Sequence, residues 1–128
     1  MARFNVLHGL RVVADAAAVE SLVKGLPTGS SALRIAPDDV LLVGHVGPVA
    51  CSDSHAIVET DVGYSGAWFT RTEFEQTVRP HMEWSLPSDG RLGQGLIAGI
   101  GSKVLAQGPT FLVVCPTAFV HELEERLG

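Results

Sequence analysis

Apolar residues recur along this chain with two different periods, and the first clear period is helical. Within residues 15–26 the apolar side chains fall three or four positions apart, at Ala16, Val19, Val23 and Leu26. Asp15 can accept hydrogen bonds from the first free amides as an N-cap. Gly25 and Pro27 end the periodic stretch. The pattern therefore predicts a helix over 15–26.

The next apolar positions predict a hairpin of two short strands. In residues 31–44 apolar and polar positions first alternate, and Val40–Val43 is then continuously apolar. Pro37 and the two aspartates that follow it are typical of a tight turn between the strands. Residues 45–54 combine glycine, proline, serine and aspartate, which predicts a linker.

The second half of the chain predicts the same kinds of element. Residues 55–70 have an extended pattern, with breaks expected near Gly63 and Gly66. A helix is predicted to follow, because Thr70 and Glu73 have the spacing of a capping box. In that motif each residue's side chain accepts a hydrogen bond from the other's backbone amide.

The C-terminal part of the chain predicts strands and a closing helix. Residues 93–108 have the pattern of a strand interrupted by glycines, and residues 110–116 that of a buried strand. Residues 117–128 predict a helix with Thr117 as its cap. The side chains expected on its inner face are Phe119, Leu123 and Leu127.

This order of elements predicts an α+β fold. Both halves, about 1–45 and 55–128, place a helix ahead of strands, and residues 45–54 link them. We expect a single domain over 1–128, in which two similar helix-plus-antiparallel-strand halves form two layers. Antiparallel pairing is favoured because the predicted turns are too short for the crossover that parallel neighbours require.

Composition excludes several functional classes. Of the 128 residues, 46% are apolar and 18% are charged, which argues against a disordered chain. The net charge is -5 and basic residues are scattered, so nucleic acid is not an expected partner. No apolar run reaches the ~18 residues of a membrane span, and we expect no signal peptide and no membrane partner. Two distant cysteines do not indicate a disulfide framework, so a reduced, cytoplasmic setting is expected.

One polar segment, residues 51–61 ("CSDSHAIVETD"), raises the question of a reactive or metal-binding site. In an unbroken strand, one face would carry Cys51, Asp53, His55, Glu59 and Asp61. The core-facing side chains would then be Ala56, Val58, Thr60 and Val62. Side chains two apart on a strand are separated by about 6–7 Å, whereas zinc ligands converge at about 2–2.3 Å from the metal. We interpret the segment as a solvated strand face or subunit contact.

Other conspicuous residues are interpreted as structural. Gly93 and Gly95 belong to a glycine set that lacks the spacing of a dinucleotide-binding fingerprint. We expect these glycines to mark bulges or a close approach of another group to the backbone. Cys115 lies in an apolar run and is expected to be a small buried hydrophobe. Trp68 and Trp84 flank the predicted second helix and can be either core anchors or interface residues.

Five local stretches carry a family resemblance. "LRIAPDDVLLVG" has Pro37, Asp38 and Leu41 at the positions of a family hairpin, and "AIVETDVGYS" has Asp61 at the acidic position of a strand motif, with Gly63 where serine is usual. The other three stretches are "EWSLP", "GQGLIAGIGSKV" and "FLVVCPTAFVHELEERL". Together they resemble, in a shortened form, the gamma subunit of heterotetrameric sarcosine oxidase, within the broad aminomethyltransferase or folate-binding-like family.

The resemblance, which covers about residues 33–127, implies a role without catalysis. It implies an accessory subunit of a multi-subunit flavin-dependent sarcosine or N-methyl amine oxidase or demethylase. In such a complex this chain has no cofactor or metal of its own, and FAD, FMN, NAD and tetrahydrofolate are bound by larger flavoprotein subunits, its expected partners. The residues expected to contact those partners are Trp68, Trp84, Asp61 and Tyr64.

Two other functions stay open. A free-standing folate- or small-ligand-binding domain of the aminomethyltransferase type would use Asp61 or Glu59 to hold a pterin ring, with Tyr64 and Trp68 stacking on it. A small enzyme would use Cys51 and a neighbouring histidine, His55, as nucleophile and base, although no third residue is evident to orient them.

Overall fold

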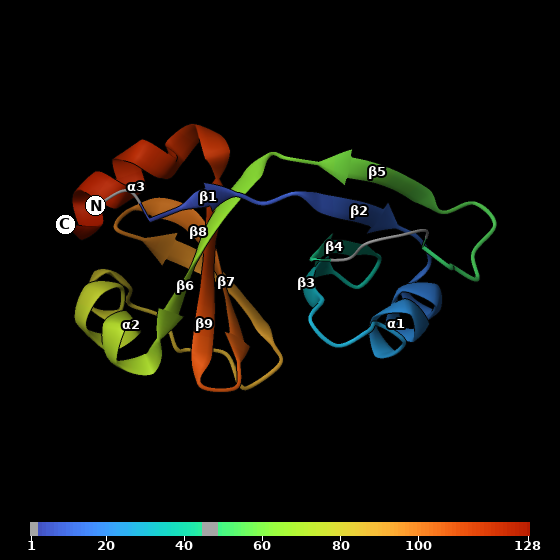
Figure 1. Ribbon diagram of the computed structural model, residues 1–128, viewed down its shortest axis with the longest axis horizontal. Coiled ribbons are helices and arrows are strands. Elements are labelled where there is room, and N and C mark those ends of the chain that lie inside the picture. Colours follow the sequence, from blue (N-terminus) through green and yellow to red (C-terminus); the bar gives the residue numbers. More distant parts are fainter. Residues whose placement is uncertain (1–2, 45–48) are drawn as a thin grey trace. The chain divides into compact units, whose positions relative to one another are not determined.

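The computed structural model describes residues 3–44 and 49–128 (Figure 1). These residues form three α-helices and nine strands, and the strands make two antiparallel sheets. The α+β class predicted from the pattern is therefore confirmed. Part of the predicted linker over 45–54 lies outside the described residues.

The chain divides into two compact units, and neither of them matches a predicted half. One unit is His8–Val62, and the other combines Met1–Leu7 with Gly63–Gly128. The segment after residue 55 was expected to begin the second half, but its first strand pairs with a strand near the N-terminus. Similar patterns of apolar and polar residues in the two halves do not show which strands pair, because strands far apart in sequence can be neighbours in a sheet.

The unit His8–Val62 is a four-stranded sheet with one helix. Its elements are β2 (Gly9–Val13), α1 (Ala16–Lys24), β3 (Ser31–Ala36), β4 (Asp39–Val43) and β5 (Ile57–Asp61), and the strand order is β3-β4-β2-β5. Every neighbouring pair is antiparallel. β2, which lies between β4 and β5, was not predicted, since only a helix was expected ahead of the hairpin.

Helix α1 forms as the pattern predicts. The side chain of Asp15 accepts a hydrogen bond from the amide of Ala18 at 2.8 Å, and Gly25 is the C-cap. Val19 is fully buried on the inner face of the helix. It packs with Val12 and Leu42 from the sheet, so the apolar stripe of α1 covers one face of β2 and β4.

The second unit is a five-stranded sheet with helices packed against it. The elements are β1 (Asn5–Val6), β6 (Tyr64–Thr70), α2 (Arg71–Thr77), the 3-10 turn η1 (Arg79–His81), β7 (Leu92–Ile97), β8 (Ile100–Gln107), β9 (Thr110–Pro116), the 3-10 turn η2 (Thr117–Phe119) and α3 (Val120–Leu127). The strand order is β1-β6-β9-β8-β7. β9 is the buried strand expected over 110–116 and lies at the centre of the sheet.

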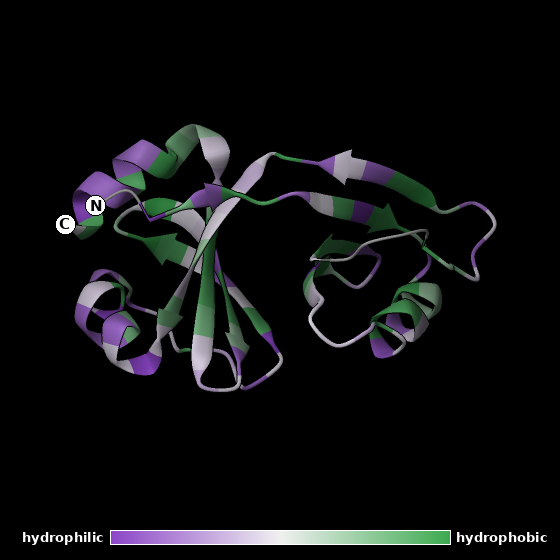
Figure 2. Cartoon of the chain, viewed as in Figure 1, coloured by the Kyte–Doolittle hydropathy of each residue, from purple (hydrophilic) through white to green (hydrophobic). Residues whose placement is uncertain are grey.

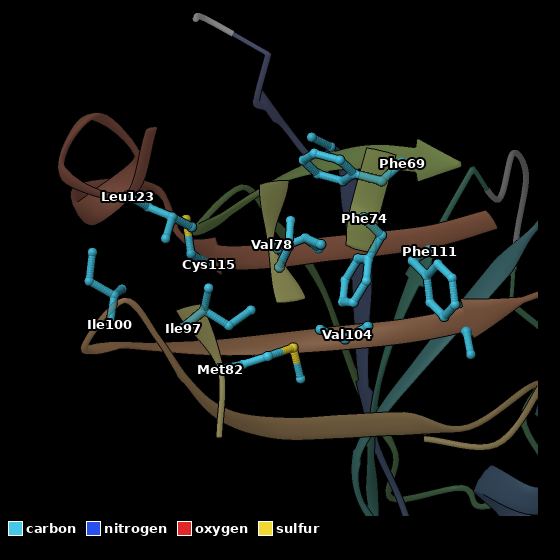
Figure 3. Packing of buried hydrophobic residues seen from close by; sticks show 13 residues of the cluster. Phe69, Phe74, Val78, Met82, Ile97, Ile100, Val104, Phe111, Cys115 and Leu123 are labelled. Carbon is cyan, nitrogen blue, oxygen red and sulfur yellow. The ribbon is translucent and has the colours of Figure 1, made fainter. Parts of the chain in front are cut away.

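The core of this unit lies between the sheet and helices α2 and α3 (Figure 3). Phe74 of α2 is fully buried, and its ring centroid lies 4.6 Å from that of Phe111 on β9. Leu123 of α3 and Cys115 of β9 are also fully buried. Burial raises the pKa of the Cys115 thiol to about 11, with a smaller contribution from the nearby charge of Glu124. Cys115 is therefore a protonated core side chain, as expected.

Three details of the predicted C-terminal part are wrong. Residues 93–108 form two strands joined by a tight turn, in which Ala98 has φ +50° and Gly99 has φ +80°. Thr117 is not the cap of α3; its hydroxyl pairs with that of Ser65 at 3.0 Å. Phe119 precedes α3 and is 47% exposed, because the chain enters the helix through η2.

One expected break in the extended segment is also absent. The chain does leave β5 before Gly63, but β6 runs unbroken through Gly66. A Cβ at Gly66 would lie 3.1 Å from Leu7 and from Leu112, so a glycine gives room there to neighbouring side chains. The glycine marks close packing within the sheet rather than a turn.

The N-terminal segment is held on the second unit by arginine and carboxylate contacts. The guanidinium of Arg3 donates two hydrogen bonds to Glu73, at 3.0 and 3.1 Å, and lies 4.1 Å from the Phe69 ring centroid. Glu73 also completes the predicted capping box with Thr70 at the start of α2. The backbone amides of Arg3 and Phe4 donate to the carboxylate of Glu124 on α3.

Replacing Glu73 with glutamine is expected to remove a pH-dependent part of the stability. Hydrogen bonds from Arg3, and then from Thr70, lower the pKa of Glu73 from its ordinary 4.5 to about 2. Since the folded pKa lies below the unfolded one, ionised Glu73 contributes fully above pH ~4.5, and this contribution is lost as the pH falls toward 2. Melting temperatures of wild type and Glu73→Gln should differ near neutral pH and converge in acid.

The matched control is Glu75→Gln, on the same helix. Glu75 is exposed and lies 3.9 Å from Arg71. Its replacement is expected to leave the acid dependence of the melting temperature close to that of the wild type. If the Glu73→Gln and wild-type curves instead run parallel down to about pH 2, Glu73 does not contribute in this way.

Candidate functional site

The polar segment 51–61 does not form one strand, so its reactive side chains do not share a face. β5 begins only at Ile57. Residues ahead of β5 form a turn around Asp53. The carboxylate of Asp53 accepts hydrogen bonds from the amide of Asp15 at 2.9 Å and from the amide of His55 at 2.8 Å. The bond from Asp15, followed by that from His55, lowers the pKa of Asp53. This carboxylate is a backbone acceptor that holds the turn.

The other reactive residues of the segment have different surroundings. Cys51 is half-buried and packs against the apolar cluster beneath α1, whereas His55 and Glu59 are exposed. In residues 3–44 and 49–128, no group of three or more histidine, cysteine or carboxylate side chains converges as metal ligands would. Most of the segment is exposed, as the interpretation of it as a solvated face or subunit contact expects.

Asp61 takes part in an ion-pair network that was not predicted. Arg11 on β2 donates two hydrogen bonds to Asp39 of β4, from Nε to Oδ1 at 2.7 Å and from Nη2 to Oδ2 at 2.6 Å. Its Nη1 lies 3.4 Å from Oδ2 of Asp61. β2 is thereby tied to both of its neighbours by one guanidinium. The fork geometry with Asp39 is the arrangement in which arginine pairs most strongly with a carboxylate.

The side chains expected to face the core from this segment are largely exposed. Val58 is 44% exposed and Val62 is 55% exposed, and Thr60 is exposed as well. The prediction was wrong for these three: Val58 and Thr60 lie on the edge strand β5, and Val62 follows its end. The cluster beneath α1 includes Ala56 but ends before β5.

The second unit carries a surface hollow built around Trp84. The indole lies against the backbone of β7: a Cβ at Gly93 or Gly95 would meet its ring at 2.7 or 2.6 Å. Its Nε1 donates to the carbonyl of Leu96 at 2.9 Å. The expectation that these glycines allow a close approach to the backbone is confirmed, and the approaching group is the indole of Trp84.

The wall of this hollow is fixed by backbone contacts. The amide of Ala98, in the β7–β8 turn, donates to the carbonyl of His81 at 2.8 Å, and the carbonyl of Ala98 accepts from Arg126 of α3 at 2.7 Å. Between the turn and residues 80–84 lies a hollow of about 560 Å³. We call it the Trp84 groove; it is lined by Pro80, His81, Glu83, Trp84, Leu96, Ala98 and Gly99. Leu96 at its rim is 60% exposed.

Two other expected contact residues lie on β6. Tyr64 and Trp68 are four residues apart on this strand and so project from the same face. Trp68 is 43% exposed, and the ammonium of Lys103 lies 5.5 Å from the Tyr64 ring centroid. These two are therefore accessible or partly accessible side chains of the sheet, and neither belongs to the core cluster around Phe74.

The four expected contact residues thus fall into three places. Trp84 lines the groove, Tyr64 and Trp68 lie on β6, and Asp61 belongs to the other unit. Leu96, an exposed residue in the lining of the groove, is one that sequence reasoning missed. Its only signal was its position in a glycine-rich stretch next to a tryptophan-containing loop.

Comparison with known proteins adds no family assignment. No protein-family model matches the chain, and no curated protein matches it. In the part of the chain that the structure describes, no helix has both the length and the apolar character needed to cross a membrane.

Proposed function

We propose that this chain is an accessory, non-catalytic subunit of a multi-subunit flavin-dependent sarcosine or N-methyl amine oxidase or demethylase, located in the cytoplasm. The observation that carries the proposal is the Trp84 groove, whose exposed Leu96 borders a rigidly held indole. The resemblance described above supplies the kind of complex. In this proposal the larger flavoprotein subunits carry FAD, FMN, NAD and tetrahydrofolate.

The groove has the features of a protein contact rather than of a reaction centre. A tryptophan side chain that neighbouring groups already hold in one conformation loses little conformational entropy when a partner covers it. Leu96 presents apolar area whose removal from water favours association, by roughly 25 cal/mol for each Å². Arg79 fixes the loop from beneath, donating to the carbonyls of Met82 and Trp84.

Copurification tests the proposal directly. A tagged chain expressed with its natural neighbours is expected to recover larger subunits whose bound flavin gives absorbance in the visible range. The recovered complex should oxidise an N-methyl amine. Recovery of the tagged chain as a monodisperse monomer from cells that contain those subunits would contradict the proposal.

Leu96→Glu is expected to disrupt this complex. The substitution places a charge at the rim of the groove, and burying an unpaired charge against a partner is costly. We expect recovery of the flavoprotein to fall at least about tenfold, which corresponds to about 1.4 kcal/mol in binding. The matched control is Ser88→Glu, which adds the same charge at an exposed position outside the groove. Equal recovery with both variants would exclude the groove from the contact.

The folate-binding alternative can be separated from this proposal by calorimetry. It relied on the carboxylate of Asp61 or Glu59, and Asp61 already faces Arg11. Tetrahydrofolate titrated into the isolated chain is expected to give no saturable heat. Saturable binding by the monomer, lost in an Asp61→Asn variant, would favour the alternative.

A further inference from the structure

The two sheets have four outer edges among the described residues, and three of them are protected in recognisable ways. β1 is only two residues long, Asn5–Val6. β3 has a register shift between Arg34 and Ala36. β7 is flanked by Trp84, whose indole Nε1 donates a hydrogen bond to the carbonyl of Leu96. Short edge strands, bulges and covering segments are the usual means by which folded proteins keep strand edges from pairing with other chains.

β5 is the fourth edge, and it has the character of a pairing strand. It pairs with β2 over its whole length, from Ile57 to Asp61, without a register shift. On its other side no described strand follows in the sheet. Ile57 and Val58 are 56% and 44% exposed, and both are β-branched residues that favour strands. An exposed edge strand that carries such residues is a template for strand addition.

The two faces of β5 differ in chemistry. Ile57, Glu59 and Asp61 point to one face, and Val58 and Thr60 to the other; Figure 2 shows apolar and polar colours mixed along this strand. The Glu59 face also carries Arg11 and Asp39, which pair across the sheet. Three carboxylates against one guanidinium leave this face with two net negative charges.

We propose that β5 binds an extended segment of a partner protein, which adds a strand to the sheet and carries basic side chains on one face and apolar side chains on the other. The basic side chains lie beside Glu59 and Asp61, and the apolar ones beside Val58. Cross-strand pairs of opposite charge and pairs of apolar side chains both stabilise neighbouring strands. The backbone of the added strand supplies the hydrogen bonds, and the alternation of its side chains supplies the specificity.

A second copy of this chain fits the edge less well. Antiparallel pairing of two β5 strands about Glu59 would place that residue opposite itself. Like charges directly opposite each other destabilise strand pairs. The whole chain carries a net charge of -5, so two copies also repel each other at long range. A basic segment of another protein meets neither penalty.

This inference rests on the proposed function only in assigning the added strand to a partner subunit. Peptide binding to β5 requires no flavoprotein. A failure of peptide binding would leave the copurification result standing, and a failure of copurification would leave peptide binding at β5 standing. The two proposals can therefore fail separately.

The experiment uses the whole chain and capped eight-residue peptides followed by amide NMR. A peptide of alternating lysine and valine is the probe, and one of alternating glutamate and valine is its charge-reversed counterpart. The lysine peptide is expected to shift and protect the amides of β5, and the glutamate peptide to bind at least about 5-fold more weakly. Glu59→Lys should reverse that preference, and the neutral Glu59→Gln should reduce it.

Controls separate strand addition from general attraction between opposite charges. A peptide with the same four lysines and four valines in two blocks has the same charge but cannot place one kind of residue on each face. It is expected to leave the β5 amides unprotected. Equal effects of the block peptide, protection centred on β7 instead of β5, or an unchanged preference in Glu59→Lys would overturn the proposal. So would a concentration-dependent dimer that protects β5 without peptide, since a second copy would then be the occupant.

Discussion

Replacing Phe74 with alanine is expected to destabilise the unit built on β6–β9 by about 3–5 kcal/mol. Phe74 is fully buried, and its ring packs against Phe111 with 4.6 Å between centroids, among residues drawn from α2, α3 and the sheet (Figure 3). Removing the ring loses its burial and leaves a cavity that the surrounding strands cannot close. Urea denaturation followed by circular dichroism measures the change.

The matched control for this variant is Phe119→Ala. Phe119 is the same residue type, but it is 47% exposed in η2. We expect its replacement to cost about 1 kcal/mol or less, in proportion to the smaller area withdrawn from water. Similar losses for both variants would mean that Phe74 is not the packing centre of this core.

Adding a single methyl group at Gly95 is expected to displace Trp84. A Cβ there would lie 2.6 Å from Cε2 and Nε1 of the indole, well inside contact distance. Gly95→Ala should therefore break the hydrogen bond to the Leu96 carbonyl and destabilise the unit by about 1–3 kcal/mol, the usual cost of overpacking. In a Trp68→Phe background, where Trp84 is the remaining tryptophan, its fluorescence should shift to the red.

Gly101→Ala is the control, since Gly101 lies on the neighbouring strand β8 with open space where its Cβ would be. It should change stability by less than about 0.5 kcal/mol and leave the fluorescence unaltered. A second test removes the clash: in a Trp84→Ala background, Gly95→Ala should lose most of its cost. If the cost persists without the indole, the strain lies in the strand itself.

The features that could be predicted from the sequence are the ones specified by residues close together in it. Asp15 caps α1 and Thr70 with Glu73 caps α2, because each motif is completed within one helical turn. The buried strand β9 was recognisable from its continuous apolar run. Such signals need no knowledge of what the element packs against.

The features that could not be predicted depend on contacts distant in sequence. Arg11 and Asp61 are fifty positions apart, and only the pairing of β2 with β5 brings them together. The β7–β8 turn was hidden because Ala98 occupies a left-handed position that usually indicates glycine or asparagine. For the candidate site, the glycines indicated a close approach to the backbone, but nothing local identified Trp84 as the group that approaches.

The pairing of β1 with β6 has a consequence for how the chain is made. Val6 lies opposite Ser65, and the amide of Leu7 donates to the carbonyl of Tyr64 at 2.8 Å, so the ends of the segment His8–Val62 leave and rejoin one sheet side by side. During synthesis this segment is complete as one continuous stretch, whereas β1 must wait for a partner strand made later. The unit His8–Val62 can therefore fold first as the chain emerges. Its folding brings residues 7 and 63 close together, and these are the points where the chain leaves and re-enters the five-stranded sheet. The entropy cost of pairing β1 with β6 is then lower.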